Sequence, residues 1–215
     1  MNAADTLVVL DTNVLLRPRL SDVIMDLRAE ALFSAHWTEN IDAEFLRNMQ
    51  KLYNKTEAAA NGRLRAMKRR CPEWEVFMTS ADFAAVPSDV DMKDRHVAAA
   101  ALALRHSAAE EEEDGVGDDY DILLVTDNVK DMAKRPMAAL GVKVMRAGAF
   151  LNACYRADSK ACERAVQQAV SDLKAPPYTA AELLYALRGQ GATTLVSGLA
   201  KTWNVVPTKR VTPRT

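Results

Sequence analysis

Two short apolar segments constrain the fold of this chain more than any other feature. Residues 6–10 read "TLVVL" and residues 122–125 read "ILLV", and an aspartate follows each run within two residues. Continuous apolar, β-branched runs of this length are typical of parallel strands that are buried on both faces of a sheet. Two further segments, "LFSAHW" at 32–37 and "VKVMRA" at 142–147, are also predicted to be strands. The segment "WEVFMT" at 74–79 is only weakly strand-like.

Helical patterns fill the stretches between these strands. We predict a helix over 21–31 with Ser21 as its N-cap and a second helix over 38–53. The helical pattern continues from there to Arg70, with a break near Asn61–Gly62. A long helix that starts between residues 91 and 94 and ends at 106, and another helix over 129–140, are also predicted. Strands that alternate with helices predict an α/β fold, in which helices flank a parallel β-sheet.

No convincing strand follows residue 150. Segments 150–174 and 179–191 have helical periodicity, and Pro176–Pro177 breaks the chain between them. We therefore expect a first domain over residues 1–150 and a small all-helical C-terminal module over residues 151–215.

Composition limits the kinds of protein to which this chain can belong. Of its 215 residues, 49% are hydrophobic and 27% charged, which is ordinary for a soluble globular protein. We expect no membrane association, because no apolar run approaches the roughly 18 residues of a membrane span and the N-terminus lacks signal-peptide features. Three cysteines without a CxxC pair favour a reduced, cytoplasmic protein.

Charge is unevenly distributed along the chain although the net charge is only −1. Residues 47–70 hold eight basic residues and one acid, while residues 110–121, "EEEEDGVGDDYD", are nearly all acidic. A local basic face of this kind can bind a polyanion, although a solvated helix surface would have the same composition.

Four acids are predicted to meet at one edge of the sheet. Asp11 and Asp127 follow two strands, Asp94 lies in the first turn of a long helix, and Glu44 lies on the helix after the second strand. Ligands of open parallel sheets bind at the carboxyl ends of the strands. Each acid alone could be a helix cap or a surface residue. Together they would repel one another unless a cation neutralised them, and hard oxygen ligands favour Mg²⁺ or Mn²⁺.

The order of four motifs resembles that of a PIN domain, in the branch that includes VapC-type toxins. The motifs are "VVLDTNVLL", "WTENIDAEFLRNM", "DVDMKDRHVAAAA" and "LLVTDNVKDM", and the resemblance covers roughly residues 6–150. The segment "AAELLYALRGQGATTLVSGL" at 180–199 resembles the helical appendage of some members. The resemblance implies a PIN-like parallel sheet and a metal-dependent nuclease, usually a ribonuclease.

The resemblance also implies roles for individual residues. Asp11 and Asp94 match metal-ligating acids, and Glu44 matches the glutamate of the second motif. Many PIN domains have a fourth acid two residues after the threonine of the "VT" strand end, and this chain has Asn128 there. Either Asp127 as a metal ligand or Asp131 as a catalytic acid would then complete the site. Thr12, Asn13 and Asn128 would orient the ligands.

The predicted function is a Mg²⁺- or Mn²⁺-dependent endoribonuclease, the toxin of a toxin–antitoxin pair. Its partners would be RNA, a cognate antitoxin and a second copy of the chain in a homodimer. Among the basic residues after Glu44, those expected to bind the RNA backbone are Lys51, Lys55, Arg63 and Arg65. His96 is interpreted as a residue that packs or caps locally. The unusual length of the acidic segment 110–119 would affect how substrate approaches.

Two other classes of protein compete with this prediction. A PIN-fold protein that binds RNA or a partner without cutting is the main alternative, because Asn128 replaces an acid. A signalling receiver domain is disfavoured, because the chain lacks an acidic pair near its N-terminus and a lysine at the end of "VKVMRA".

Overall fold

The computed structural model describes residues 6–113, 120–174 and 177–210. Its centre is a parallel sheet of β1 (Thr6–Leu10), β2 (Ser34–His36), β3 (Asp121–Val125) and β4 (Val142–Met145), in the order β2-β1-β3-β4. The predicted α/β class and all four predicted strands are confirmed. "WEVFMT" forms no strand and contributes one bridge, between Trp37 and Glu75. Most of the acidic segment 110–119 lies outside the described residues.

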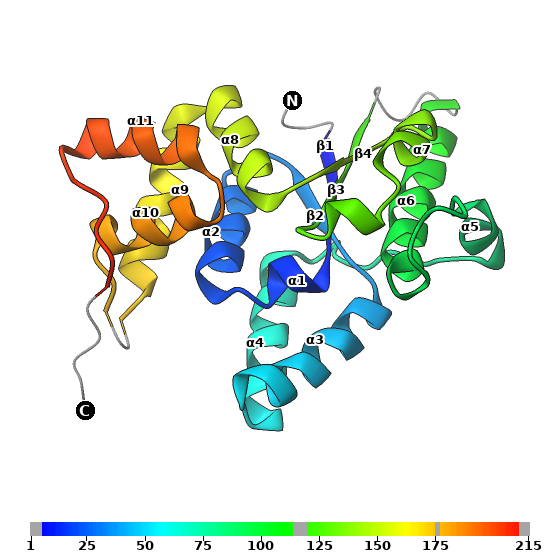
Figure 1. Ribbon diagram of the computed structural model, residues 1–215, viewed down its shortest axis with the longest axis horizontal. Coiled ribbons are helices and arrows are strands. Elements are labelled where there is room, and N and C mark those ends of the chain that lie inside the picture. Colours follow the sequence, from blue (N-terminus) through cyan, green and yellow to red (C-terminus); the bar gives the residue numbers. More distant parts are fainter. Residues whose placement is uncertain (1–5, 114–119, 175–176, 211–215) are drawn as a thin grey trace.

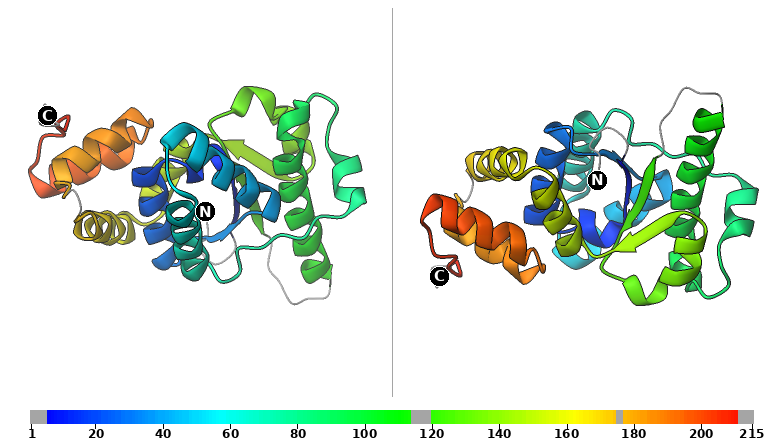
Figure 2. Two further views of the ribbon diagram at one scale, coloured as in Figure 1. Left: turned by 90° about the horizontal axis from the view of Figure 1, so that it is seen from below. Right: turned by 90° about the horizontal axis from the view of Figure 1, so that it is seen from above.

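The helices that precede β3 are α1 (Thr12–Leu15), α2 (Pro18–Ala29), α3 (Glu39–Tyr53), α4 (Glu57–Arg70), α5 (Ser80–Ala85) and α6 (Arg95–Glu113), with a 3₁₀ turn η2 (Met92–Asp94) before α6. A second 3₁₀ turn, η3 (Val129–Asp131), and α7 (Lys134–Ala139) join β3 to β4. Figure 2 shows α6 on one side of the sheet and α2 on the other. The sheet therefore lies between helical layers, which explains its continuous apolar runs.

Two of the differences between predicted and observed helices have local causes. Helix α2 begins at Pro18, whose fixed φ suits the first helical position, and Ser21 lies inside the helix with its hydroxyl donating to the Arg17 carbonyl. Helix α4 continues through Asn61–Gly62, and the chain breaks earlier, at Asn54 in the left-handed region. Thr56 then caps α4 by accepting a hydrogen bond from the Ala59 amide.

The C-terminal module consists of α8 (Ala147–Ala157), α9 (Ser159–Asp172), α10 (Ala180–Gly189) and α11 (Thr193–Trp203). The predicted helical segment 150–174 is divided at Asp158, whose carboxylate accepts from the Ala161 amide and starts α9. Helix α9 packs along α2, so the module shares a continuous core with the sheet-bearing part (Figure 1). The domain boundary at residue 150 stays a prediction.

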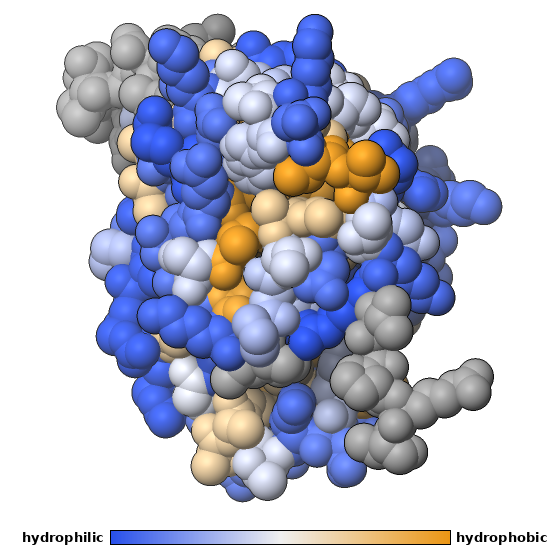
Figure 3. Space-filling view, turned by 90° about the vertical axis from the view of Figure 1, so that its left-hand side faces the viewer, coloured by the Kyte–Doolittle hydropathy of each residue, from blue (hydrophilic) through white to orange (hydrophobic). Residues whose placement is uncertain are grey.

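The outer face of the C-terminal helices is mostly hydrophilic. Figure 3 shows it with a narrow apolar strip and one apolar patch between charged side chains. Within the described ranges, no helix is both long and apolar enough to cross a membrane. The module therefore packs most of its apolar side chains inward, against itself and α2.

Gly148 permits α8 to contact the turn between α10 and α11 directly. A Cβ atom at this position would lie 2.1 Å from the carbonyl oxygen of Gln190, which is backbone and has little freedom to move. We expect Gly148→Ala to lower the free energy of unfolding by about 2 kcal/mol, as measured by urea denaturation. Gly62→Ala is the matched control, because nothing lies within 4 Å of its Cβ position in α4. The control should raise stability by about 0.5 kcal/mol, and an equal loss in both variants would contradict this account.

Candidate active site

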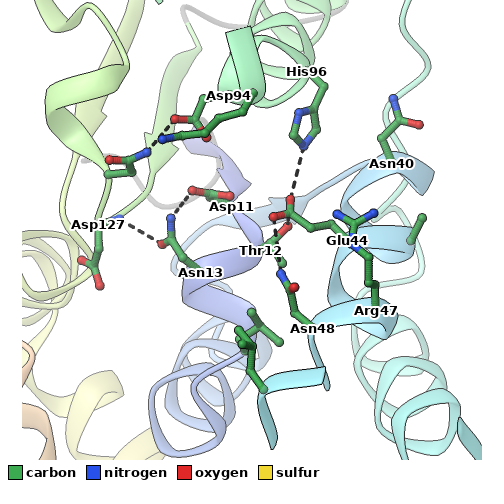
Figure 4. Close-up of a pocket in the computed structure, with 15 residues that line it drawn as sticks. Asp11, Thr12, Asn13, Asn40, Glu44, Arg47, Asn48, Asp94, His96 and Asp127 are labelled. Carbon is green, nitrogen blue, oxygen red and sulfur yellow. Dashed lines mark hydrogen bonds and ion pairs between the residues drawn. The ribbon is translucent and has the colours of Figure 1, made fainter. Parts of the chain in front are cut away.

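A cavity of about 880 Å³ opens at the carboxyl ends of β1 and β3, where the sequence predicted a cleft (Figure 4). Residues of α1, α3, η2 and the β3–η3 turn surround it. Its polar and charged lining residues are Asp11, Thr12, Asn13, Asn40, Glu44, Arg47, Asn48, Lys93, Asp94, His96, Asp127 and Asn128. We refer to this cavity as the acidic pocket.

Asp11 is fixed at the end of β1 by both backbone and side-chain hydrogen bonds. Its amide donates to the Val125 carbonyl (3.1 Å), which extends the β1–β3 pairing by one residue. The Thr126 hydroxyl donates to its carboxylate at 2.6 Å, and the Asn13 side-chain amide donates to the same oxygen. Only 4% of Asp11 is exposed, and burial raises the pKa of its carboxyl although the Thr126 hydrogen bond opposes the shift.

Asp94 faces the same pocket from the end of η2. The side-chain amide of Asn128 donates to its carboxylate at 2.6 Å, so Asn128 orients this acid. The pKa of Asp94 is raised to about 6. Burial of the carboxyl is the main cause, and the negative charge of Asp11 is the second. The charge of Asp11 therefore acts on Asp94 across the pocket.

Glu44 points into the pocket from α3. The Thr12 hydroxyl donates to Oε2 at 2.8 Å, and Asn48 donates to Oε1 at 3.4 Å. Asn40, Glu44 and Asn48 recur every four residues and therefore share one face of α3. This four-residue spacing is visible in the sequence. Asn40, Asn48 and the neighbouring Arg47 line the pocket together with Glu44.

His96 belongs to the pocket and is not merely a packing residue. Its Nε2 lies 3.5 Å from Oε2 of Glu44 (Figure 4). The interpretation of His96 as locally packed is therefore wrong. Its position just after Asp94, at the start of α6, could have indicated this, because both side chains then project from the same end of the helix.

The side chains of Asp127, Asn128 and Asp131, the three candidates for the fourth position of the site, point in different directions. The carboxylate of Asp127 pairs with Arg17 and turns away from Asp11 and Asp94 (Figure 4), while its backbone amide donates to Asn13 at 3.0 Å. The Oδ2 atom of Asp131 lies 3.3 Å from Nζ of Lys93, and Asp131 does not line the acidic pocket. Asn128 alone of the three directs its side chain at Asp94.

The basic segment after Glu44 is only partly available to a substrate. Lys51, Lys55 and Arg65 are exposed, as a role in binding RNA requires. Arg63 instead donates to Ser21 (2.6 Å) and Asp22 (3.1 Å) and holds α4 against α2, so the geometry does not support its predicted role. The sequence could not reveal this, because the partners of Arg63 are about forty residues away along the chain.

The metal-ligating ability of the site rests on its oxygen atoms. Among the residues that the structure describes, no group of three or more His, Cys, Asp or Glu side chains is arranged as a ready metal site. Asp11 and Asp94 nevertheless supply two carboxylates to one pocket, with Glu44 nearby. Burial disfavours the ionised forms of both acids, and the neighbouring charges of Glu44 at Asp11 and of Asp11 at Asp94 add to this effect, so a cation would stabilise them.

The raised pKa of Asp94 predicts a pH-dependent stability. Its folded-state pKa of about 6 exceeds the ordinary 3.8, so the ionised carboxyl destabilises the folded protein above about pH 6 and not below about pH 4. In EDTA, Asp94→Asn should therefore be more stable than the wild type by about 1 kcal/mol at pH 7, allowing for solvent screening. Urea denaturation of both proteins near pH 4 and at pH 7 checks this. An equal difference at both pH values would contradict it.

Comparison with known protein families gives a match in the C-terminal module. Residues 147–201, from the start of α8 into α11, match the family described as the VapC50 C-terminal domain. Searches of curated proteins and of solved structures return no match.

Proposed function

Because its C-terminal helices point to the VapC toxin family, we propose that the chain is a Mg²⁺- or Mn²⁺-dependent endoribonuclease whose active site is the acidic pocket. In this proposal the protein is the toxin of a toxin–antitoxin pair. A cognate antitoxin that covers the pocket and a second copy of the chain would be its protein partners.

The observation that carries the proposal is the pairing of Asp11 with Asp94. Their carboxylates come from the end of β1 and from η2, far apart in the sequence, and face one open pocket in which the charge of Asp11 raises the pKa of Asp94. Two partly buried acids of this kind would bind either protons or a cation. Their hard oxygen atoms favour Mg²⁺ or Mn²⁺ over softer metals.

Each part of the pocket has a distinct role in the proposed reaction. Asp11 and Asp94 would hold the metal, which when bound lowers the pKa of a water and stabilises negative charge on a phosphodiester. Thr126 and Asn13 fix the Asp11 carboxylate, and Asn128 fixes that of Asp94. These hydrogen bonds limit the reorganisation required when substrate enters.

Glu44 would hold or transfer a proton at the edge of the pocket. Thr12 donates to its Oε2 and His96 lies 3.5 Å from the same atom, so this oxygen has a fixed position. Arg47 lines the same side and would contact a phosphate of the RNA. Exposed Lys51 lies one helical turn further along α3 and would extend this contact. Single-stranded RNA is the expected substrate, because its backbone can enter an open pocket without a duplex around it.

The alternative is a PIN-fold protein that binds RNA but does not cut it. The observation that favours it is Asn128, which donates an amide hydrogen bond to Asp94 where many PIN domains carry an acid. Calorimetric titration with Mn²⁺ separates the two functions. A catalytic site should bind the metal through Asp11 and Asp94, whereas an inactive one should release little or no heat.

Metal removal tests the proposal directly. We expect purified protein to cleave single-stranded RNA in Mg²⁺ or Mn²⁺ and to lose more than about a hundredfold in rate when EDTA is added, because stabilisation of several kcal/mol is removed. Dialysis into Mg²⁺ should restore the rate. Cleavage that persists in EDTA would contradict the proposed function.

A further inference from the structure

A second cavity of about 490 Å³ lies beside the acidic pocket, between α1–α2 and the C-terminal module. It is lined by Arg17, Asp127, Arg146, Ala149, Asn152, Gly189, Gln190 and Gly191. Asp127 lines both cavities, so the two are adjacent. We refer to the second cavity as the arginine pocket.

Hydrogen bonds fix one wall of the arginine pocket. Asn152, only 9% exposed, donates to the Gly191 carbonyl (3.0 Å) and accepts from the amides of Thr194 and Leu195 (2.9 and 3.1 Å). The turn between α10 and α11 is thereby fixed to α8, and the close contact at Gly148 brings the two backbones together. A pocket with a fixed wall can bind a ligand without first ordering a loop.

Positive charge dominates the arginine pocket. Arg17 pairs with Asp127 and donates to Gln190, and both contacts use Nη1. Arg146 is exposed at the N-cap of α8, and its side chain has no hydrogen bond or ion pair with any residue in the described part of the chain. The first turn of α8 also contains no acid. Two guanidinium groups therefore face one carboxylate, which is already paired, so the pocket favours an anion.

We infer that the arginine pocket binds a phosphate group of the RNA backbone adjacent to the phosphodiester in the acidic pocket, with Arg146 as its principal contact. The inference rests on the proposed function. Two cavities that share a wall residue suit a continuous polymer of phosphates better than a small free anion. Guanidinium groups bind phosphate oxygens through paired N–H donors, which a lysine cannot do.

This inference gives the C-terminal module a role in substrate binding. Ala149 and Asn152 of α8 and Gly189–Gly191 at the end of α10 lie within the segment that matches the VapC50 C-terminal domain, and Arg146 directly precedes that segment. Arg17 comes from the sheet-bearing part of the chain and would be shared between Asp127 and the incoming phosphate. The substrate would thus bridge the two parts of the chain.

RNA binding by Arg146→Ala, compared with Arg156→Ala, tests the inference. Both arginines are exposed and lie on or directly before α8, so the two variants lose the same charge, but Arg156 lies near the other end of the helix. Binding of a 5′-fluorescein-labelled single-stranded RNA dodecamer would be followed by fluorescence anisotropy in EDTA, which prevents cleavage, across a range of salt concentrations. Arg146→Ala should weaken binding by about fivefold to tenfold and reduce the salt slope by about 0.7. Arg156→Ala should remain within about twofold of the wild type.

The outcomes separate this inference from the proposed function. If the two variants bind RNA equally well, or the wild type does not bind RNA, the arginine pocket is not an RNA subsite. An acidic segment of a protein partner would then be the better occupant. If Arg146→Ala alone loses affinity but the wild type never cleaves RNA in Mg²⁺, the subsite stands and the nuclease assignment fails.

Discussion

Asp11→Asn and Asp94→Asn are each expected to lower RNA cleavage by more than about a hundredfold while the protein remains folded. Asparagine keeps an oxygen that can accept the hydrogen bonds from Thr126 or Asn128, so the pocket retains its shape. It loses the negative charge that would bind a divalent cation. The variants should also be at least as stable as the wild type in EDTA, because burial disfavours both carboxylates in their ionised forms.

The rate of RNA cleavage in Mg²⁺ and the urea denaturation curve of each variant measure the two effects. Asp121→Asn is a suitable control, since it removes an exposed carboxylate at the opposite end of β3. The control should cleave RNA at the wild-type rate. Full activity of either Asp11→Asn or Asp94→Asn would show that the acidic pocket is not the catalytic site.

Phe150→Ala is expected to cause the largest loss of stability among the substitutions considered. Phe150 is fully buried in α8, and its ring packs edge-to-face on Phe33 with 4.9 Å between ring centroids. Phe33 directly precedes β2, so this contact joins the C-terminal module to the sheet. Truncation would leave a cavity in the shared core, which typically costs about 3–5 kcal/mol.

Urea denaturation followed by circular dichroism measures this loss, with Phe77→Ala as control. Phe77 is 79% exposed, and its truncation should change stability by less than about 0.5 kcal/mol. One cooperative transition at a lower urea concentration would support a continuous core. A small effect for Phe150→Ala would indicate instead that α8–α11 fold independently of the sheet.

Features that depend on local patterns were predictable from the sequence. The strands were recognisable because both faces of the sheet are covered, which makes each strand a continuous apolar run. Parallel strands end at one edge, so the position of Asp11 followed from topology, and Asp94 followed from the helix start beside it.

Features that depend on distant partners were not predictable. Asp127 lies one residue further beyond its strand than Asp11 does, because Leu10 pairs with Val125, and its carboxylate turns toward Arg17, more than a hundred residues away along the chain. The ion pair of Arg63 was hidden for the same reason, since Asp22 comes to it only through tertiary packing. The arginine pocket could not be foreseen either, because its lining residues come from both parts of the chain.

The chemistry of the product ends tests the central claim most directly. Mass spectrometry of the fragments from a single-stranded RNA cleaved in Mg²⁺ should show that together they have gained one water, with no 2′,3′-cyclic phosphate. That result follows if the acidic pocket activates a water to attack the phosphodiester. Fragments that end in a 2′,3′-cyclic phosphate, or RNA that remains intact in both Mg²⁺ and Mn²⁺, would contradict the account.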